Sequence, residues 1–153
     1  MLPPLELALN TGSVGTLNIG SDVGPAVAAG TLNASSVVFG AGTGTLNFSH
    51  TSTGYNFGAA MSSGTGSATI NQLAGITNLT GDSSAFSGTT NVTGDTLGVT
   101  GSTGKLGSAT STMNVSNGTL AVLGGGVVNS ANTNIGAPAG SNGIEPSTGQ
   151  AHR

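Results

Sequence analysis

Apolar and polar residues alternate in two closely similar segments of the chain. Residues 90–99 (TNVTGDTLGV) recur as residues 113–122 (MNVSNGTLAV), so that each position of the first segment has a counterpart in the second. In the first copy Val92, Leu97 and Val99 are separated by polar or small residues, a period typical of a strand with one buried face. A fixed period of about 23 residues predicts a solenoid, in which each repeat buries its apolar face only against its neighbours.

Two arrangements are compatible with this repeat. The two copies can pair as parallel strands, because the chain between them exceeds the roughly dozen residues that a parallel crossover needs. Leu97 and Leu120 then occupy equivalent inward positions in neighbouring coils and stack in the core, with threonines facing outward beside them. Alternatively, Asn117-Gly118 is typical of a tight hairpin turn, and residues 113–116 would pair antiparallel with residues 119–122. The first arrangement is the one we expect.

The remaining alternating runs are short and separated by turn residues. Gly-Thr-Leu-Asn occurs at 15–18, 30–33 and 44–47. These copies are too close together to mark successive coils of about 23 residues, so we expect them to lie on different faces of neighbouring coils. Residues 22–25 end in Gly-Pro and predict a loop. Further short runs that we expect to form strands lie at 36–39, 67–73, 75–80, 127–128 and 132–135.

The composition indicates a folded chain with an uncharged surface. Only 5% of the 153 residues are charged and 3% are aromatic, whereas 28 are Gly. Hydrophobic residues nevertheless make up 35% and lie in alternating runs, so they can form a core. A net charge of −3 argues against nucleic acid or an anionic membrane as a partner. The absence of cysteine fits an exported protein, since no disulfide can form during passage across a membrane.

The chain contains SGTG at 63–66, INQ at 70–72, LTGDSSAFSGTT at 79–90 and GDTLGV at 94–99. With these motifs, residues 63–99 resemble the passenger-associated transport repeat, an autotransporter-associated β-strand repeat of bacterial passenger domains. The upstream residues 37–51 are similar to the segment that precedes this repeat, and GTLAV at 118–122 is similar to the end of another unit. Asp95 departs from the family pattern, which usually has Gly there, and we expect an outward Asp to be tolerated at this bend.

This resemblance implies an all-β fold, a right-handed parallel β-helix (β-solenoid) of about 23 residues per coil. We expect residues 1–136 to form a β-helix passenger fragment and residues 137–153 a disordered polar tail, cut off before the translocator barrel of type V secretion. The expected location is the surface of a Gram-negative bacterium, attached to the outer membrane through that barrel. The expected role is a structural stalk that supports adhesion and assists vectorial export. Expected partners are the barrel, an unknown surface ligand and further copies of the chain.

Few side chains could carry out chemistry. His50 has no G-x-S-x-G nucleophile motif to accompany it, and we interpret it as a surface residue beside a turn. The segment 101–106 lacks the spacing of a phosphate-binding loop. We therefore expect no enzyme activity, no catalytic residue, no cofactor and no metal site. The six Asn-x-Ser/Thr sequons are interpreted as by-products of the strand pattern. The acids are Glu6, Asp22, Asp82, Asp95 and Glu145, and the bases are His50, Lys105, His152 and Arg153.

Two alternative functions remain open. The first is a β-helix carbohydrate-active enzyme, although Asp82 and Asp95 are well separated along the chain and a shared fold is no indication of shared activity. The second is a free-standing solenoid whose Thr and Asn rows bind an ordered surface such as ice. A partial row for this purpose is formed by Thr77, Thr80, Thr90 and Thr93.

Overall fold

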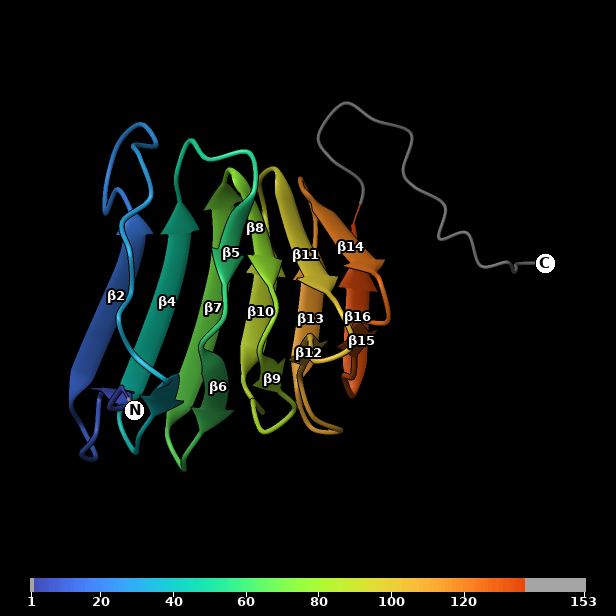
Figure 1. Cartoon of the computed structure of the whole chain (residues 1–153). Coiled ribbons are helices and arrows are strands. Elements are labelled where there is room, and N and C mark those ends of the chain that lie inside the picture. The colour runs from blue at the N-terminus through green and yellow to red at the C-terminus, as the bar shows by residue number, and fades with distance from the viewer. Residues whose placement is uncertain (1, 137–153) are drawn as a thin grey trace.

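The chain folds into a parallel β-solenoid of about four turns (Figure 1). The computed structural model describes residues 2–136, and the tail expected at 137–153 lies outside the described residues. The strand pairings between coils are parallel, so the predicted all-β solenoid is confirmed and the hairpin is excluded. β11 (Thr96–Thr100) and β14 (Thr119–Leu123) pair with Leu97 opposite Leu120 and Thr96 opposite Thr119, the predicted register.

Within residues 2–136, four sheets run along the solenoid axis. The longest contains six strands, and the two three-stranded sheets lie one after the other, joined by a bridge between Ser62 and Ala85. The six-stranded sheet consists of β2 (Val14–Gly20), β4 (Thr43–Ser49), β7 (Ser67–Ala74), β10 (Thr89–Val92), β13 (Thr112–Val115) and β16 (Asn132–Ile135). The four-stranded sheet consists of β5 (Tyr55–Phe57), β8 (Ile76–Leu79), β11 (Thr96–Thr100) and β14 (Thr119–Leu123). The short sheets consist of β1 (Leu5–Leu7), β3 (Ser36–Phe39) and β6 (Ala60–Ser63), then β9 (Asp82–Ser83), β12 (Lys105–Leu106) and β15 (Val127–Val128).

The first coil is longer than the others, and this overturns one expectation. Thr16 pairs with Thr45, whereas Thr89 pairs with Thr112, so the first coil contains several additional residues. The first and third Gly-Thr-Leu-Asn copies therefore lie side by side on the same face, in β2 and β4, and the prediction of different faces was wrong. The reason is the connection between β2 and β3, residues 21–35, which contains the predicted loop and the second copy of the tetrapeptide.

Inward side chains stack in columns from coil to coil. Phe48, Gln72 and Val92 occupy one such column in the six-stranded sheet, and each is no more than 1% exposed. Phe48 also contacts Phe57 of the four-stranded sheet edge-on, with ring centroids 5.2 Å apart. The core therefore fills the space between the sheets, as the alternation of apolar residues predicts.

Glycines occupy corners where two coils approach closely. A Cβ added at Gly88 would lie 2.1 Å from the backbone oxygen of Ala68, and one at Gly66 would lie 1.9 Å from that of Gly42. Real Cβ atoms do not approach a neighbouring backbone so closely, so only Gly fits without moving the coils apart. The high Gly content thus has a packing reason at these corners.

Candidate functional site

The outer face of the six-stranded sheet carries two rows of like polar side chains, which we call the Thr–Asn face. The rows arise because the parallel register places the same Thr-x-Asn tripeptide of β2, β4, β7, β10 and β13 side by side. The Thr row is Thr16, Thr45, Thr69, Thr89 and Thr112. The Asn row is Asn18, Asn47, Asn71, Asn91, Asn114 and Asn134.

The Asn row is a continuous ladder of side-chain hydrogen bonds. Asn91 Nδ2 donates to Asn71 Oδ1 at 2.9 Å, and Asn114 Nδ2 donates to Asn91 Oδ1 at 2.8 Å, with the same polarity at every rung from Asn18 to Asn134. An Asn amide has two N–H groups and a carbonyl oxygen with two lone pairs. Each interior amide therefore keeps one N–H and one lone pair for solvent or a ligand, in an orientation fixed by its neighbours.

The Thr row beside the ladder has unused hydroxyl groups. Within the described residues, the structure gives the side chains of Thr69, Thr89 and Thr112 no hydrogen bond. A Thr hydroxyl both donates and accepts, and the branched Cβ restricts its χ1 rotamers. The face thus presents regularly spaced, rotationally restricted hydroxyls and amides, and neither row contains a charged residue.

A hollow of about 420 Å³ adjoins the Thr row where three successive coils enter the six-stranded sheet; we call it the hydroxyl hollow. Its other lining residues are Gly66, Ala68 and Gly88, and no charged side chain lines it. The hydroxyl side chains that line it are Ser63, Ser67, Thr69, Ser87, Thr89, Thr110 and Thr112.

Unequal turn lengths accompany this hollow. The connection between β6 and β7 has three residues, 64–66, whereas that between β12 and β13 has five, 107–111. The longer turn is held by Ser111 Oγ, which lies 2.9 Å from the backbone oxygens of Ser108 and Asn129, and by a 3.1 Å contact between the Ser108 and Thr110 hydroxyls. Thr110 of this turn lines the hollow, so the additional residues contribute to its wall.

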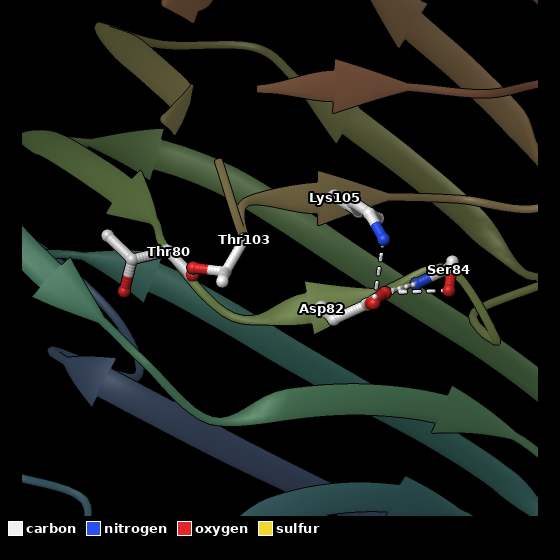
Figure 2. A network of polar contacts seen from close by, with 5 residues as sticks. All are labelled: Thr80, Asp82, Ser84, Thr103 and Lys105. Carbon is white, nitrogen blue, oxygen red and sulfur yellow. Dashed lines mark hydrogen bonds and ion pairs between the residues drawn. The ribbon is translucent and has the colours of Figure 1, made fainter. Parts of the chain in front are cut away.

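A separate polar network lies on the short sheet of β9 and β12 (Figure 2). Lys105 Nζ donates to Asp82 Oδ2 at 3.1 Å, and the backbone N–H and hydroxyl of Ser84 donate to Asp82 Oδ1 at 3.0 and 2.6 Å. The Ser84 donors and then Lys105 lower the pKa of Asp82 to about 2. Any stability gained is therefore present above pH 3.8 and is lost as the pH falls toward 2. Both side chains are over 40% exposed, so the ion pair contributes little to stability. Because it joins paired residues of neighbouring coils, we assign it to coil-to-coil registration.

His50 is buried in the core, so its interpretation as a surface residue was wrong. It is 1% exposed, and its Nε2 lies 2.8 Å from Thr77 Oγ1. Burial lowers the pKa of His50, although the Ser52 backbone and the charge of Asp95 act in the opposite direction. His50 Nδ1 and Gln72 Oε1 are both buried without a hydrogen-bond partner in the described structure. The imidazole is thus a buried core group, not a base facing solvent.

Asp95 adopts a backbone conformation that favours Gly, and its side chain has a partner that accommodates Asp there. Its φ is +50°, in the left-handed region that Gly adopts at least cost. The exposed Asp95 carboxylate accepts a hydrogen bond from the Gly75 N–H at 2.7 Å, which links two neighbouring coils. The expected tolerance has this physical basis, because Asp is among the few residues that adopt αL readily and here its side chain gains a partner.

The structure does not bring the remaining sequence candidates into one site. Asp82 and Asp95 have separate partners, and within residues 2–136 no group of three or more His, Cys, Asp or Glu side chains is placed to hold a metal ion. Thr77 and Thr90 of the partial Thr row are buried, so they cannot belong to a surface array. Glu145, His152 and Arg153 lie outside the described residues.

The Thr row and the Asn row were not predicted from the sequence, although a signal for them exists. Thr-x-Asn recurs at residues 16–18, 45–47, 69–71, 89–91 and 112–114. The intervals between successive copies vary from 20 to 29 positions, so a search for one fixed period does not find them. The sequons at Asn47, Asn91 and Asn114 are a second sequence signal of the same rows, because these three residues belong to the Asn ladder.

The described residues define a parallel β-solenoid with an uncharged, regular outer face. Comparison with known proteins adds no relative: no family model, curated protein or solved structure matches the chain. None of the described residues forms a helix that is long and apolar enough to cross a membrane.

Proposed function

We propose that this chain is a solenoid stalk from the passenger of a bacterial autotransporter. The proposal places it outside the cell, carried by a translocator barrel in the outer membrane, where it supports adhesion and assists its own export. It is supported by the resemblance of residues 63–99 to the passenger-associated transport repeat. It is also consistent with the lack of cysteine and with the low content of charged residues.

One structural observation carries the proposal. The resembling segment contains β7, β8, β10 and β11, and each of these strands pairs in parallel with a strand of the preceding coil and of the following coil. Before the following coil is added, each of these strands has one free edge, and that edge is the template on which the coil can form. A chain that emerges from a pore in one direction can therefore fold one coil at a time, and each new coil buries apolar surface that opposes its return.

The experiment is a secretion assay with a matched pair of variants. The whole chain is placed between an export signal and a translocator barrel in a Gram-negative host, and its surface level is measured by protease treatment of intact cells. We expect display of a protease-resistant core. Val99→Asp places a charge at a position that is 0% exposed, so we expect the surface level to fall severalfold.

Val122→Asp is the control, because Val122 pairs with Val99 in the next coil and is 45% exposed. We expect the surface level of this variant to remain near that of the unchanged chain. Equal surface levels for all three proteins would contradict the export role, and so would retention of the unchanged chain inside the cell.

A further inference from the structure

We infer that the hydroxyl hollow, with the Thr row beside it, binds an uncharged glycan chain that lies along the solenoid axis. This inference names a ligand class for the adhesive role proposed above, and it rests on that proposed function. It is tested on the purified chain, so binding and export can fail separately.

The size and lining of the hollow indicate a small polar ligand or a short part of a polymer. Its volume of about 420 Å³ falls within the range of about 300 to 1,000 Å³ that is typical of ligand sites. Most ligand sites are predominantly apolar, whereas this one is lined mainly by hydroxyls and small residues. An apolar ligand would leave these hydroxyls without partners, so the lining favours a ligand that is itself rich in hydrogen-bonding groups.

The hydrogen-bonding capacity matches a polyhydroxylated, neutral molecule. The hydroxyls of Ser67, Thr69, Thr89 and Thr112 have no hydrogen bond within the described residues, and each can both donate and accept. Sugar hydroxyls have the same dual capacity. The lining contains no Lys, Arg, Asp or Glu, so nothing in it selects for a charged ligand.

The geometry favours an extended chain that contacts several coils. Thr69, Thr89 and Thr112 come from successive parallel strands, which lie about 4.8 Å apart. The row therefore repeats along the solenoid axis and can contact consecutive units of a polymer. Stiff Thr side chains and the locked Asn ladder lose little conformational freedom on binding, which reduces the entropic cost of association.

An ordered ice surface is the competing ligand for a regular Thr–Asn face. Ice is a flat lattice, however, and a flat lattice leaves a recess of about 420 Å³ unfilled. A chain molecule can enter the recess and continue along the row. The observations therefore favour the glycan.

The test measures retention of the purified chain on immobilised polysaccharides. The probes are an unsubstituted β-glucan, a mannan and the acidic polymer polygalacturonate, with adsorption to an ice surface measured in parallel. The binding variant is Thr69→Val with Thr89→Val, which removes two hydroxyls and keeps β-branched side chains that suit a strand. The control is Thr96→Val with Thr119→Val, a cross-strand pair of threonines in the four-stranded sheet, which does not line the hollow.

We expect retention on at least one neutral polysaccharide, weak retention on polygalacturonate, and a loss of at least tenfold in affinity for the binding variant only. Equal melting temperatures of the two double variants establish that both are folded. The inference is overturned if no neutral polysaccharide retains the chain, if the acidic polymer or ice is bound in preference, or if both variants bind equally well.

Discussion

Two consecutive coils carry nearly the same sequence and differ in burial. In β11, Leu97 and Val99 are 0% exposed, whereas their partners in β14, Leu120 and Val122, are partly buried and 45% exposed respectively. The column of Val92 and Val115 ends at Ile135, which is 50% exposed. The side chains are alike, so the difference comes from the neighbours: within the described residues, β11 has a strand on each side and β14 has one.

This comparison shows that a solenoid core position is defined by the next coil as much as by its own residue. A repeat protein is stabilised by interfaces between neighbouring repeats, and a terminal repeat has one interface fewer. Register and burial are therefore separate properties: the predicted pairing of Leu120 with Leu97 is confirmed, and Leu120 packs against the core but is only partly buried.

The largest expected effect comes from shortening the two equivalent leucines. Leu97→Ala removes a fully buried side chain and leaves a cavity, so we expect a loss of about 2 to 5 kcal/mol in the free energy of unfolding. Leu120→Ala removes a side chain that is only partly buried, and we expect about 1 kcal/mol. Urea unfolding measures both values. Equal losses would mean that the last coil is covered in solution.

Acidification gives the next largest effect and acts on the well-packed part. Burial lowers the pKa of His50 below its usual 6.5, so the contribution of the neutral imidazole to stability is fully present above pH 6.5 and is lost as the pH falls through 6.5 toward the lower pKa of the folded state. The ionisable groups near His50 are Asp95 and Tyr55, and burial raises the pKa of Tyr55. We expect the urea concentration at the unfolding midpoint to decrease as the pH is lowered from 7.5 to 5.5.

His50→Gln is the comparison protein for this pH series, because Gln is polar and does not titrate. Its urea midpoint should change little over the same range, since Asp82 titrates near pH 2, far below it. A pH dependence that is the same in both proteins would assign the effect to another group.

A smaller difference is expected along the Asn ladder. Asn91→Ala removes two side-chain hydrogen bonds at an interior rung, and Asn134→Ala removes one at an exposed rung. At roughly 1 kcal/mol per hydrogen bond, we expect the interior change to destabilise the chain by about 1 to 2 kcal/mol and the terminal change by about half as much. Thermal unfolding of the two variants measures the difference. Identical melting temperatures would mean that water replaces the ladder without cost.

The smallest expected effect is on self-association, because we expect the purified chain to associate weakly through its two end coils. Within the described residues, β2 and β16 each have a partner on one edge only, and exposed strand edges tend to pair with other chains. Ile135→Lys places a charge at the end of the apolar column of Val92 and Val115. We therefore expect it to reduce the mass measured by light scattering at high concentration. Thr119→Lys adds the same charge on the outer face of β14 and should leave that mass unchanged.

The sequence contains enough information for the fold but not for the surface. The recurrence of residues 90–99 at 113–122 predicted the pairing of Leu97 with Leu120, because alternation and parallel pairing follow from local chemistry. The Thr row needs the register of every coil, and coils differ in length because their turns differ. The burial of His50 depends on Thr77 in the next coil, which no local pattern around residue 50 indicates.

The Asn ladder has a consequence for how such a gene can change in length. Its rungs join like side chains with one polarity, so the ladder does not depend on how many coils lie between its ends. An in-frame deletion of residues 71–90 would remove one rung and leave Asn91 to donate to Asn47 in place of Asn71. Recombination between repeats can therefore add or remove whole rungs, because the two Asn side chains that meet at the new junction can form the same hydrogen bond.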